Sequence, residues 1–140
     1  MDYKNLQNDV EKYFETQKDI LCVYLFGSFS RGTNSSKSDL DIGVILKEHN
    51  NSNAYYQRRL ELMGDLSSIV KREVDVVILN NTSTFMKFHV LESGKRIYEN
   101  RYRESRSFEA KAMVEYFDFA FIKNRLEKGL IKNLRKANHG

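Results

Sequence analysis

Two short apolar segments, separated by a polar loop, constrain the fold of this chain most strongly. The first covers residues 21–26 and stops at Gly27, and the second covers residues 40–46. Short runs of branched and aromatic residues bounded by turn formers are typical of β-strands. The stretch 30–38 between them contains no residue that would seed a core. The sequence therefore predicts two strands joined by a polar loop.

Two aspartates stand where the second apolar segment begins. Asp39 and Asp41 are two residues apart, so on a strand both side chains point to the same side. Like charges placed side by side are costly unless a cation lies between them. Magnesium, which binds one or two carboxylates together with substrate phosphates, is such a cation. The pair therefore indicates a metal site that also receives a phosphate-containing substrate.

The end of the first segment supplies the complementary feature. Gly27 allows a sharp turn after the strand and a close approach by a ligand. Ser28 can cap a short helix, which leaves backbone N–H groups and a hydroxyl facing an anion. A phosphate-binding turn and a metal-binding pair one strand apart indicate phosphoryl or nucleotidyl transfer.

The spacing of these four residues, Gly-Ser-x10-Asp-x-Asp, resembles the signature of the DNA polymerase beta-like nucleotidyltransferases. The continuation Gly-Ser-x-x-Arg-Gly, which brings in Arg31 and Gly32, is most similar to the minimal nucleotidyltransferase branch. Many members of that branch are antitoxins paired with a HEPN-domain ribonuclease toxin. The resemblance is clearest over residues 21–98 and looser on either side.

Asp75 interrupts a run of β-branched residues at 72–79. A carboxylate buried there without a partner would be expensive, so one interpretation is an edge strand with Asp75 facing solvent. The resemblance implies another, in which Asp75 is the third carboxylate of the metal site. Asp39 and Asp41 would then hold two magnesium ions, and Asp75 would hold the ion on the nucleophile's side and assist deprotonation.

The resemblance also implies how ATP would bind. Gly27 and Ser28 would grip the β- and γ-phosphates, with pyrophosphate as the leaving group. Arg31, in the loop between the two halves of the motif, would neutralise triphosphate charge. The basic residue Lys37 in the same loop is more typical of a solvated surface lysine.

The function implied by the resemblance is transfer of AMP from ATP to a tyrosine hydroxyl of a HEPN toxin, which silences the toxin. Two alternatives remain open. One keeps the site but uses a small-molecule acceptor, as in aminoglycoside nucleotidyltransferases, which usually carry a further domain. The other is a non-catalytic antitoxin that acts by binding alone. Direct contact with nucleic acid is not expected.

The predicted fold class is α/β (α+β), a polymerase beta-like nucleotidyltransferase fold with a small mixed sheet flanked by helices. Residues 1–140 fit one domain, with a core over about 3–100 and a long C-terminal helix over about 104–135. The single cysteine, Cys22, permits no internal disulfide, and no apolar stretch suggests a membrane span or signal peptide. We therefore expect a cytoplasmic protein.

Further helices are predicted by apolar spacing at 3–16, at about 56–71 and at 84–92, with a short strand at 95–98. The adjacent Arg58 and Arg59 are expected on the solvent side of their helix. His89 is expected to be partly packed, and a buried, unreactive thiol is expected at Cys22.

The C-terminal helix combines charge with apolar surface. Residues 101–140 contain ten Lys or Arg and five Asp or Glu, a net charge of +5. This excess suits nucleic acid or an acidic partner, and a solvated basic face explains it equally well. The segment 116–121 is apolar around most of the helix, which requires cover on several sides. A hetero-oligomer with the toxin through this helix and a helix wedged into its own domain are both open.

Overall fold

The computed structural model describes residues 3–27, 39–48 and 51–139. Within them the chain forms the following elements in order: α1 (Tyr3–Glu15), β1 (Ile20–Phe26), β2 (Leu40–Leu46), α2 (Ser52–Val70), β3 (Val74–Ile78), the 3-10 turn η1 (Leu79–Asn81), α3 (Thr84–Ser93), β4 (Lys95–Glu99) and α4 (Tyr102–His139). Within the described residues, the helices and strands expected from the sequence are present, and their bounds differ by a few residues. The short helix expected after Ser28 lies outside the described residues.

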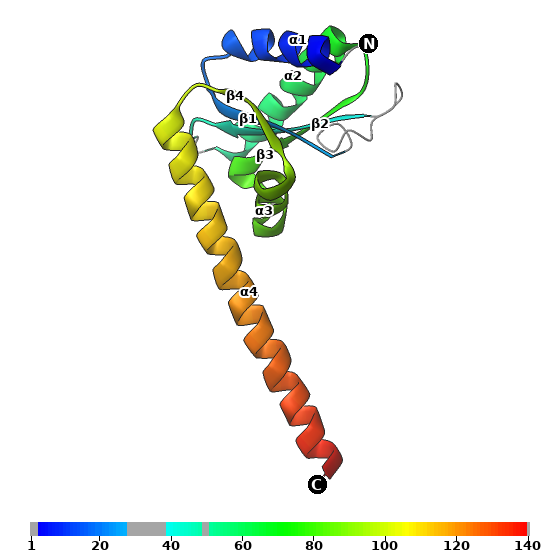
Figure 1. Ribbon diagram of the computed structural model, residues 1–140, viewed down its shortest axis with the longest axis vertical. Helices are drawn as coiled ribbons and strands as arrows, with labels where there is room; N and C mark the ends of the chain where they lie inside the picture. The colour runs from blue at the N-terminus through cyan, green and yellow to red at the C-terminus, as the bar shows by residue number, and fades with distance from the viewer. Residues whose placement is uncertain (1–2, 28–38, 49–50, 140) are drawn as a thin grey trace.

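The strands form one mixed sheet in the order β3-β2-β1-β4. β1 is antiparallel to both of its neighbours, β2 and β4, whereas β2 and β3 run parallel. The parallel pair requires a crossover, which α2 supplies. Helices cover both sides of this sheet (Figure 1). The prediction of a small mixed sheet flanked by helices is confirmed.

The helices α1 and α2 cover one face of the sheet. Leu6, Val10 and Phe14 recur every four residues along α1 and are buried, so they form the apolar stripe that packs on the strands. From α2, Leu62 and Leu66 are completely buried in the same cluster. Alternate residues of β1, β2 and β3 point into this cluster, which is the main core of the protein.

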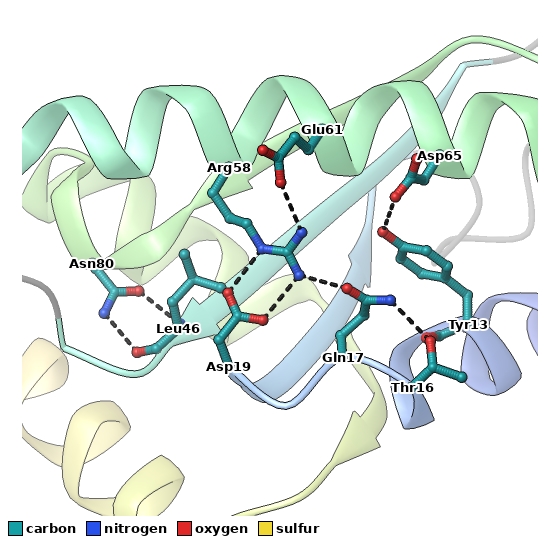
Figure 2. A network of polar contacts seen from close by, with 9 residues as sticks. All are labelled: Tyr13, Thr16, Gln17, Asp19, Leu46, Arg58, Glu61, Asp65 and Asn80. Carbon is teal, nitrogen blue, oxygen red and sulfur yellow. Dashed lines mark hydrogen bonds and ion pairs between the residues drawn. The ribbon is translucent and has the colours of Figure 1, made fainter.

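Polar contacts join α2 to the start of β1 (Figure 2). Arg58 donates to both carboxylate oxygens of Asp19, at 2.8 and 2.9 Å, and to the side chain of Gln17 at 2.7 Å. The hydroxyl of Tyr13 donates to Asp65 at 2.7 Å, which joins α1 to α2. The expectation that Arg58 faces solvent is wrong, because its guanidinium group points toward the loop before β1 and binds Asp19 and Gln17 there.

The other face of the sheet carries α3 and the first part of α4. Ser83 caps α3 by accepting a hydrogen bond from the backbone N–H of Met86. The start of α4 is fixed by Glu109, which accepts hydrogen bonds from Tyr24 of β1 and from Arg96 of β4. Burial raises the pKa of the Tyr24 hydroxyl, and the contact with Glu109 raises it further. The hydroxyl therefore stays protonated as a donor.

The helix α4 starts two residues earlier than predicted and continues to His139. Figure 1 shows its second half running away from the sheet and from α3. Every residue from 121 to 138 is exposed. Among the described helices, none has both the length and the apolar content needed to cross a membrane.

Candidate active site

Strand register brings two of the predicted carboxylates together. Asp41 of β2 lies directly opposite Asp75 of the parallel neighbour β3. On both strands the flanking residues point into the main core on the α1/α2 side. Because side chains alternate across a strand, Asp41 and Asp75 lie on the α3 side. Asp39 precedes β2 by one residue and is exposed, and the same alternation places it on that side.

Gly27 meets Asp41 at the ends of the antiparallel pair. Phe26, the last residue of β1, pairs in register with Asp41. Gly27 follows with φ of +73°, a conformation that favours glycine. A Cβ atom added to Gly27 would lie 2.3 Å from the Oδ2 atom of Asp41. Only glycine therefore allows the carboxylate to approach the backbone so closely, and the two halves of the sequence motif come together here.

Two predicted nucleotide ligands, Ser28 and Arg31, lie outside the described residues. Their assignment to the β- and γ-phosphates and to triphosphate charge stays a prediction. Of the predicted nucleotide-binding set, Gly27 is the residue that the structure places, beside Asp41.

Arg59 lies beside the candidate site, a position that sequence reasoning did not predict. Its side chain is 39% exposed, in partial agreement with the expected solvent side of the helix. Its helix, α2, covers the opposite face of the sheet, but the side chain reaches around β3, which is the edge strand. Nε donates to the carbonyl oxygen of Val76 at 2.6 Å, and a terminal nitrogen donates to Oδ1 of Asp75 at 3.0 Å. Asp75 is thus a half-exposed residue of an edge strand with a cationic partner. The position of Asp75 within a run of β-branched residues was the feature of the sequence that indicated a need for a cationic partner.

Two nearby residues behave as expected from the sequence. The ring of His89, on α3, packs edge-on against Phe26 with centroids 6.3 Å apart, so His89 is partly packed. Cys22 is buried, and burial raises the pKa of its thiol above the ordinary value. A thiol in this environment is a poor nucleophile.

The donor chemistry of the site suits magnesium, because carboxylate oxygens are its preferred protein ligands. Asp39 and Asp41 share one side of β2, and the close approach at Gly27 leaves no room for a side chain beside Asp41. Within the described ranges, no group of three or more His, Cys, Asp and Glu side chains is arranged to hold a metal ion. Asp75 contacts Arg59 there, and its role as a third ligand stays a prediction.

A groove of about 620 Å³ lies at the opposite end of β2 from Asp41. Its lining includes Leu46 and Lys47 at that strand end, Lys87 of α3, and Phe108 and Lys111 of α4. Of the predicted site residues that the structure describes, none lines it. The groove and the predicted carboxylate site therefore lie at opposite ends of β2.

Comparison with known proteins decides the family. Residues 8–103 match the family described as "Polymerase beta, Nucleotidyltransferase". The chain belongs to this nucleotidyltransferase family. The matched range contains the sheet, Gly27 and all three aspartates. The superfamily predicted from the spacing of the glycine, serine and aspartates is confirmed.

One curated relative is the protein adenylyltransferase MntA of Shewanella oneidensis. It is 33% identical to this nucleotidyltransferase over 94 residues, which are 67% of this chain and 64% of MntA. The match thus spans somewhat less than two thirds of the relative's length.

Solved structures extend the likeness to nearly the whole chain. One similar structure is a toxin–antitoxin complex with AMP-PNP. It has a TM-score of 0.71 and 26% identity, and the match covers 89% of this chain and 98% of the other. A second similar structure is the complex of a tri-AMPylated HEPN toxin with an MNT antitoxin from S. oneidensis. It has a TM-score of 0.68 and 23% identity, and the match covers 93% of this chain and 99% of the other. This second likeness shows a shared fold, and the predicted polymerase beta-like fold is confirmed.

Proposed function

We propose that this nucleotidyltransferase is an antitoxin that transfers AMP from ATP to a tyrosine hydroxyl of a HEPN-domain toxin in the cytoplasm. One observation carries the proposal above the others. Gly27 and Asp41 meet at adjoining strand ends, and Asp75 stands in register beside Asp41. This juxtaposition of a phosphate-binding turn with carboxylates is what nucleotidyl transfer requires. The adenylyltransferase MntA and the structure with AMP-PNP support ATP as the nucleotide.

In the proposed reaction the tyrosine oxygen attacks the α-phosphorus of ATP. A bond forms between these two atoms, the bond from the α-phosphorus to the bridging oxygen breaks, and pyrophosphate leaves. Gly27 and Ser28 hold the β- and γ-phosphates, and Arg31 adds positive charge. The phenolic proton passes to the carboxylate of Asp75.

Asp39 and Asp41 are the residues that would hold two magnesium ions, with Asp75 as the third ligand. When bound, magnesium would neutralise phosphate charge and lower the pKa of the attacking hydroxyl. Positioning and charge neutralisation account for most of the rate gain in such reactions. The protein's own contribution is to fix the carboxylates on one side of β2.

Two features of the chain bear on whether the acceptor of AMP is a protein or a small molecule. The exposed apolar side chains of α4 suit a protein acceptor, which needs a surface to dock on. A small-molecule acceptor needs an enclosing pocket, and the groove among the described residues lies at the far end of β2 from Asp41. A protein acceptor is therefore preferred to an aminoglycoside-type one.

The experiment that tests the proposal is intact mass spectrometry of a purified HEPN-domain toxin incubated with this chain, ATP and magnesium. A parallel sample carries Asp39→Asn and Asp41→Asn, which keep shape but remove the charges. The expected result is a mass gain of one or more AMP units with the native chain and an AMP-transfer rate lower by about 10³-fold with the variant. No gain, with the variant still protecting cells from the toxin, would instead establish an antitoxin that acts by binding alone.

A further inference from the structure

The first part of α4 packs against the body along one face. Ser105 and Ala112 on this face are buried, and Phe108 packs against the smaller core cluster, to which β1, β2, η1 and α3 contribute. Tyr116 stacks on Phe88 of α3 with ring centroids 3.7 Å apart. These contacts are spaced by three or four residues, which is the period of one helix face.

The same face continues beyond the body. Five apolar residues of α4 extend the spacing, and we name them the distal stripe: Phe119, Ile122, Leu126, Leu130 and Leu134. Each is more than half exposed, from 54% at Phe119 to 69% at Leu126. In Figure 1 this part of the ribbon lies past α3 and the sheet. The packing face of α4 is therefore covered at its start and uncovered along its second half.

The distal stripe is long enough for a protein contact. Its ends are 15 residues apart, which is about 22 Å along a helix at 1.5 Å per residue. Scattered single apolar residues on a surface need no explanation, whereas a contiguous strip of this size marks an interaction site. An apolar helix face of this kind fits against another helix.

Gly129 adds a second observation on the same side of α4. It lies three residues after Leu126 and next to Leu130, and a Cβ atom built on it meets nothing within 4 Å. Glycine inside a helix costs about 1 kcal/mol relative to alanine, and among the described residues no contact explains its presence. Next to the distal stripe, the missing side chain would allow a partner's backbone to approach closely.

The charge of the second half of α4 indicates which kind of partner can bind to the distal stripe. Residues 118–138 carry six Lys or Arg and two Asp or Glu, a net charge of +4. Two copies packed stripe to stripe would bring two such segments within about 10 Å, a separation similar to the screening length at physiological salt. A second copy is therefore opposed by repulsion, and a partner with acidic residues beside its own apolar face is favoured.

We propose that the distal stripe, with the gap at Gly129, docks an acidic amphipathic helix of a partner protein. Resting on the proposed function, that partner is the HEPN toxin that receives AMP. The stripe would then hold the acceptor while its tyrosine enters the carboxylate site, so binding and transfer depend on separate parts of the molecule.

Binding of the full-length chain to a purified HEPN-domain toxin, measured by calorimetry without ATP, tests this assignment. Leu126→Gln with Leu130→Gln should raise the dissociation constant about 100-fold, near tenfold per leucine. The affinity of the native chain should also fall as salt is raised. AMP-PNP binding, measured on the same variant, should be unchanged because the carboxylates are distant from the stripe.

Two glycine variants provide a matched comparison. Gly129→Ala should strengthen the free helix and yet weaken toxin binding, since its methyl group fills the gap. Gly64 is at an exposed position of α2, and a Cβ atom built on it also meets nothing within 4 Å, so Gly64→Ala should leave binding unchanged. Opposite effects on helix stability and on binding are not expected of a residue that matters only for folding.

Three outcomes would overturn the assignment. Toxin binding that is unchanged by the leucine variant would place the docking surface elsewhere, even where AMP transfer proceeds. A dimer of the native chain in sedimentation that the leucine variant abolishes would identify a second copy as the occupant. Stripe-dependent binding to vesicles of 7:3 phosphatidylcholine and phosphatidylglycerol, with unchanged toxin affinity, would identify a lipid surface. Absence of AMP transfer together with stripe-dependent toxin binding would count against the proposed function alone.

Discussion

The two faces of the sheet differ in how they are used. Among the described residues, the main cluster on the α1/α2 face contains 18 buried residues, whereas the cluster on the α3/α4 face contains seven. The carboxylates lie on the second face, at the ends of strands whose other face is fully packed. The α1/α2 face therefore supplies most of the stability of the fold. This stability allows groups that are unfavourable for folding, such as the paired aspartates, to lie on the α3/α4 face. Substitutions on the two faces should therefore change different quantities.

The largest expected effect is a loss of stability from the α1/α2 face. Leu62→Ala removes a completely buried side chain and should lower the free energy of unfolding by about 3 kcal/mol. Urea unfolding of the isolated chain measures this loss. Leu134→Ala, at an exposed position of α4, is the matched control and should change stability by less than about 0.5 kcal/mol. Equal losses at both positions would mean that α4 is covered in solution.

The next largest effect concerns the geometry of the carboxylate face. Gly27→Ala forces a Cβ atom toward Oδ2 of Asp41 at a residue with positive φ, so the carboxylate must move. A displacement of about 1 Å in a catalytic group costs about 100-fold in rate, which corresponds to about 2.7 kcal/mol in the barrier. AMP transfer per folded molecule measures it.

Gly43→Ala is the control for that substitution. Its Cβ atom would lie 2.7 Å from Cγ1 of Val90, so it also crowds the sheet but touches no carboxylate. We expect a stability loss of about 1–3 kcal/mol with the transfer rate of the folded fraction preserved. If Gly43→Ala slows transfer as much as Gly27→Ala, crowding of the sheet and not the position of Asp41 controls the rate.

A smaller effect distinguishes two adjacent arginines. Arg59→Gln removes the cation from Asp75 and should slow AMP transfer about tenfold, about 1.4 kcal/mol in the barrier. The loss of stability should be under about 1 kcal/mol, because both partners of this ion pair are at least 39% exposed. Arg58→Gln breaks the contacts with Asp19 and Gln17 and should do the reverse, lowering stability without slowing transfer.

That pair of variants also separates a positioning role from a general charge effect. Arg59→Lys keeps the positive charge but cannot donate to Val76 and Asp75 in the same fork. Partial recovery of the rate by lysine would indicate that charge suffices, and no recovery would indicate that the geometry of the guanidinium matters. A normal transfer rate for Arg59→Gln would show that the ion pair between Arg59 and Asp75 does not contribute to the reaction.

The sequence predicted the parts of this fold that depend on local patterns. The spacing of Leu6, Val10 and Phe14 predicts a helix because periodicity and burial agree there. The motif predicted a phosphate-binding turn and a metal-binding pair one strand apart, because both are marked by residues at the ends of the two apolar segments. The register that brings Gly27 beside Asp41 came from the structure. The contacts of Arg59 were not predictable in this way. They depend on β3 being the edge strand, a feature of the three-dimensional order of the sheet that no local pattern contains.

The prediction for Asp75 was also limited by what a local pattern contains. Asp75 was found as an interruption in a β-branched run, which signals a polar role but not its kind. Its register opposite Asp41 required the parallel pairing of β2 with β3. The exposed half of α4 was expected only as a helix that needs cover, because sequence alone does not reveal which part of a continuous apolar stripe the body reaches.

The smallest expected effect is a change in pH dependence on the stabilising face. Burial raises the pKa of Tyr13, and its hydrogen bond to Asp65 raises it further. A group whose pKa is raised by folding stabilises the folded state fully below its unfolded pKa, about 10 for tyrosine. That contribution is lost as pH rises above about 10, since the unfolded chain ionises first. The free energy of unfolding, measured by urea titration between pH 8 and 11, should therefore fall at the alkaline end.

Tyr13→Phe should lower stability by about 1 kcal/mol at pH 8 and should make the alkaline fall less steep. Tyr56→Phe, at a tyrosine of α2 that is 60% exposed, is the control and should keep the native slope. Neither substitution touches the carboxylate face, so AMP transfer at pH 8 should be unchanged in both. A slower transfer by Tyr13→Phe would show that the two faces of the sheet are coupled, because its hydroxyl lies on the α1/α2 side, across the sheet from Asp41.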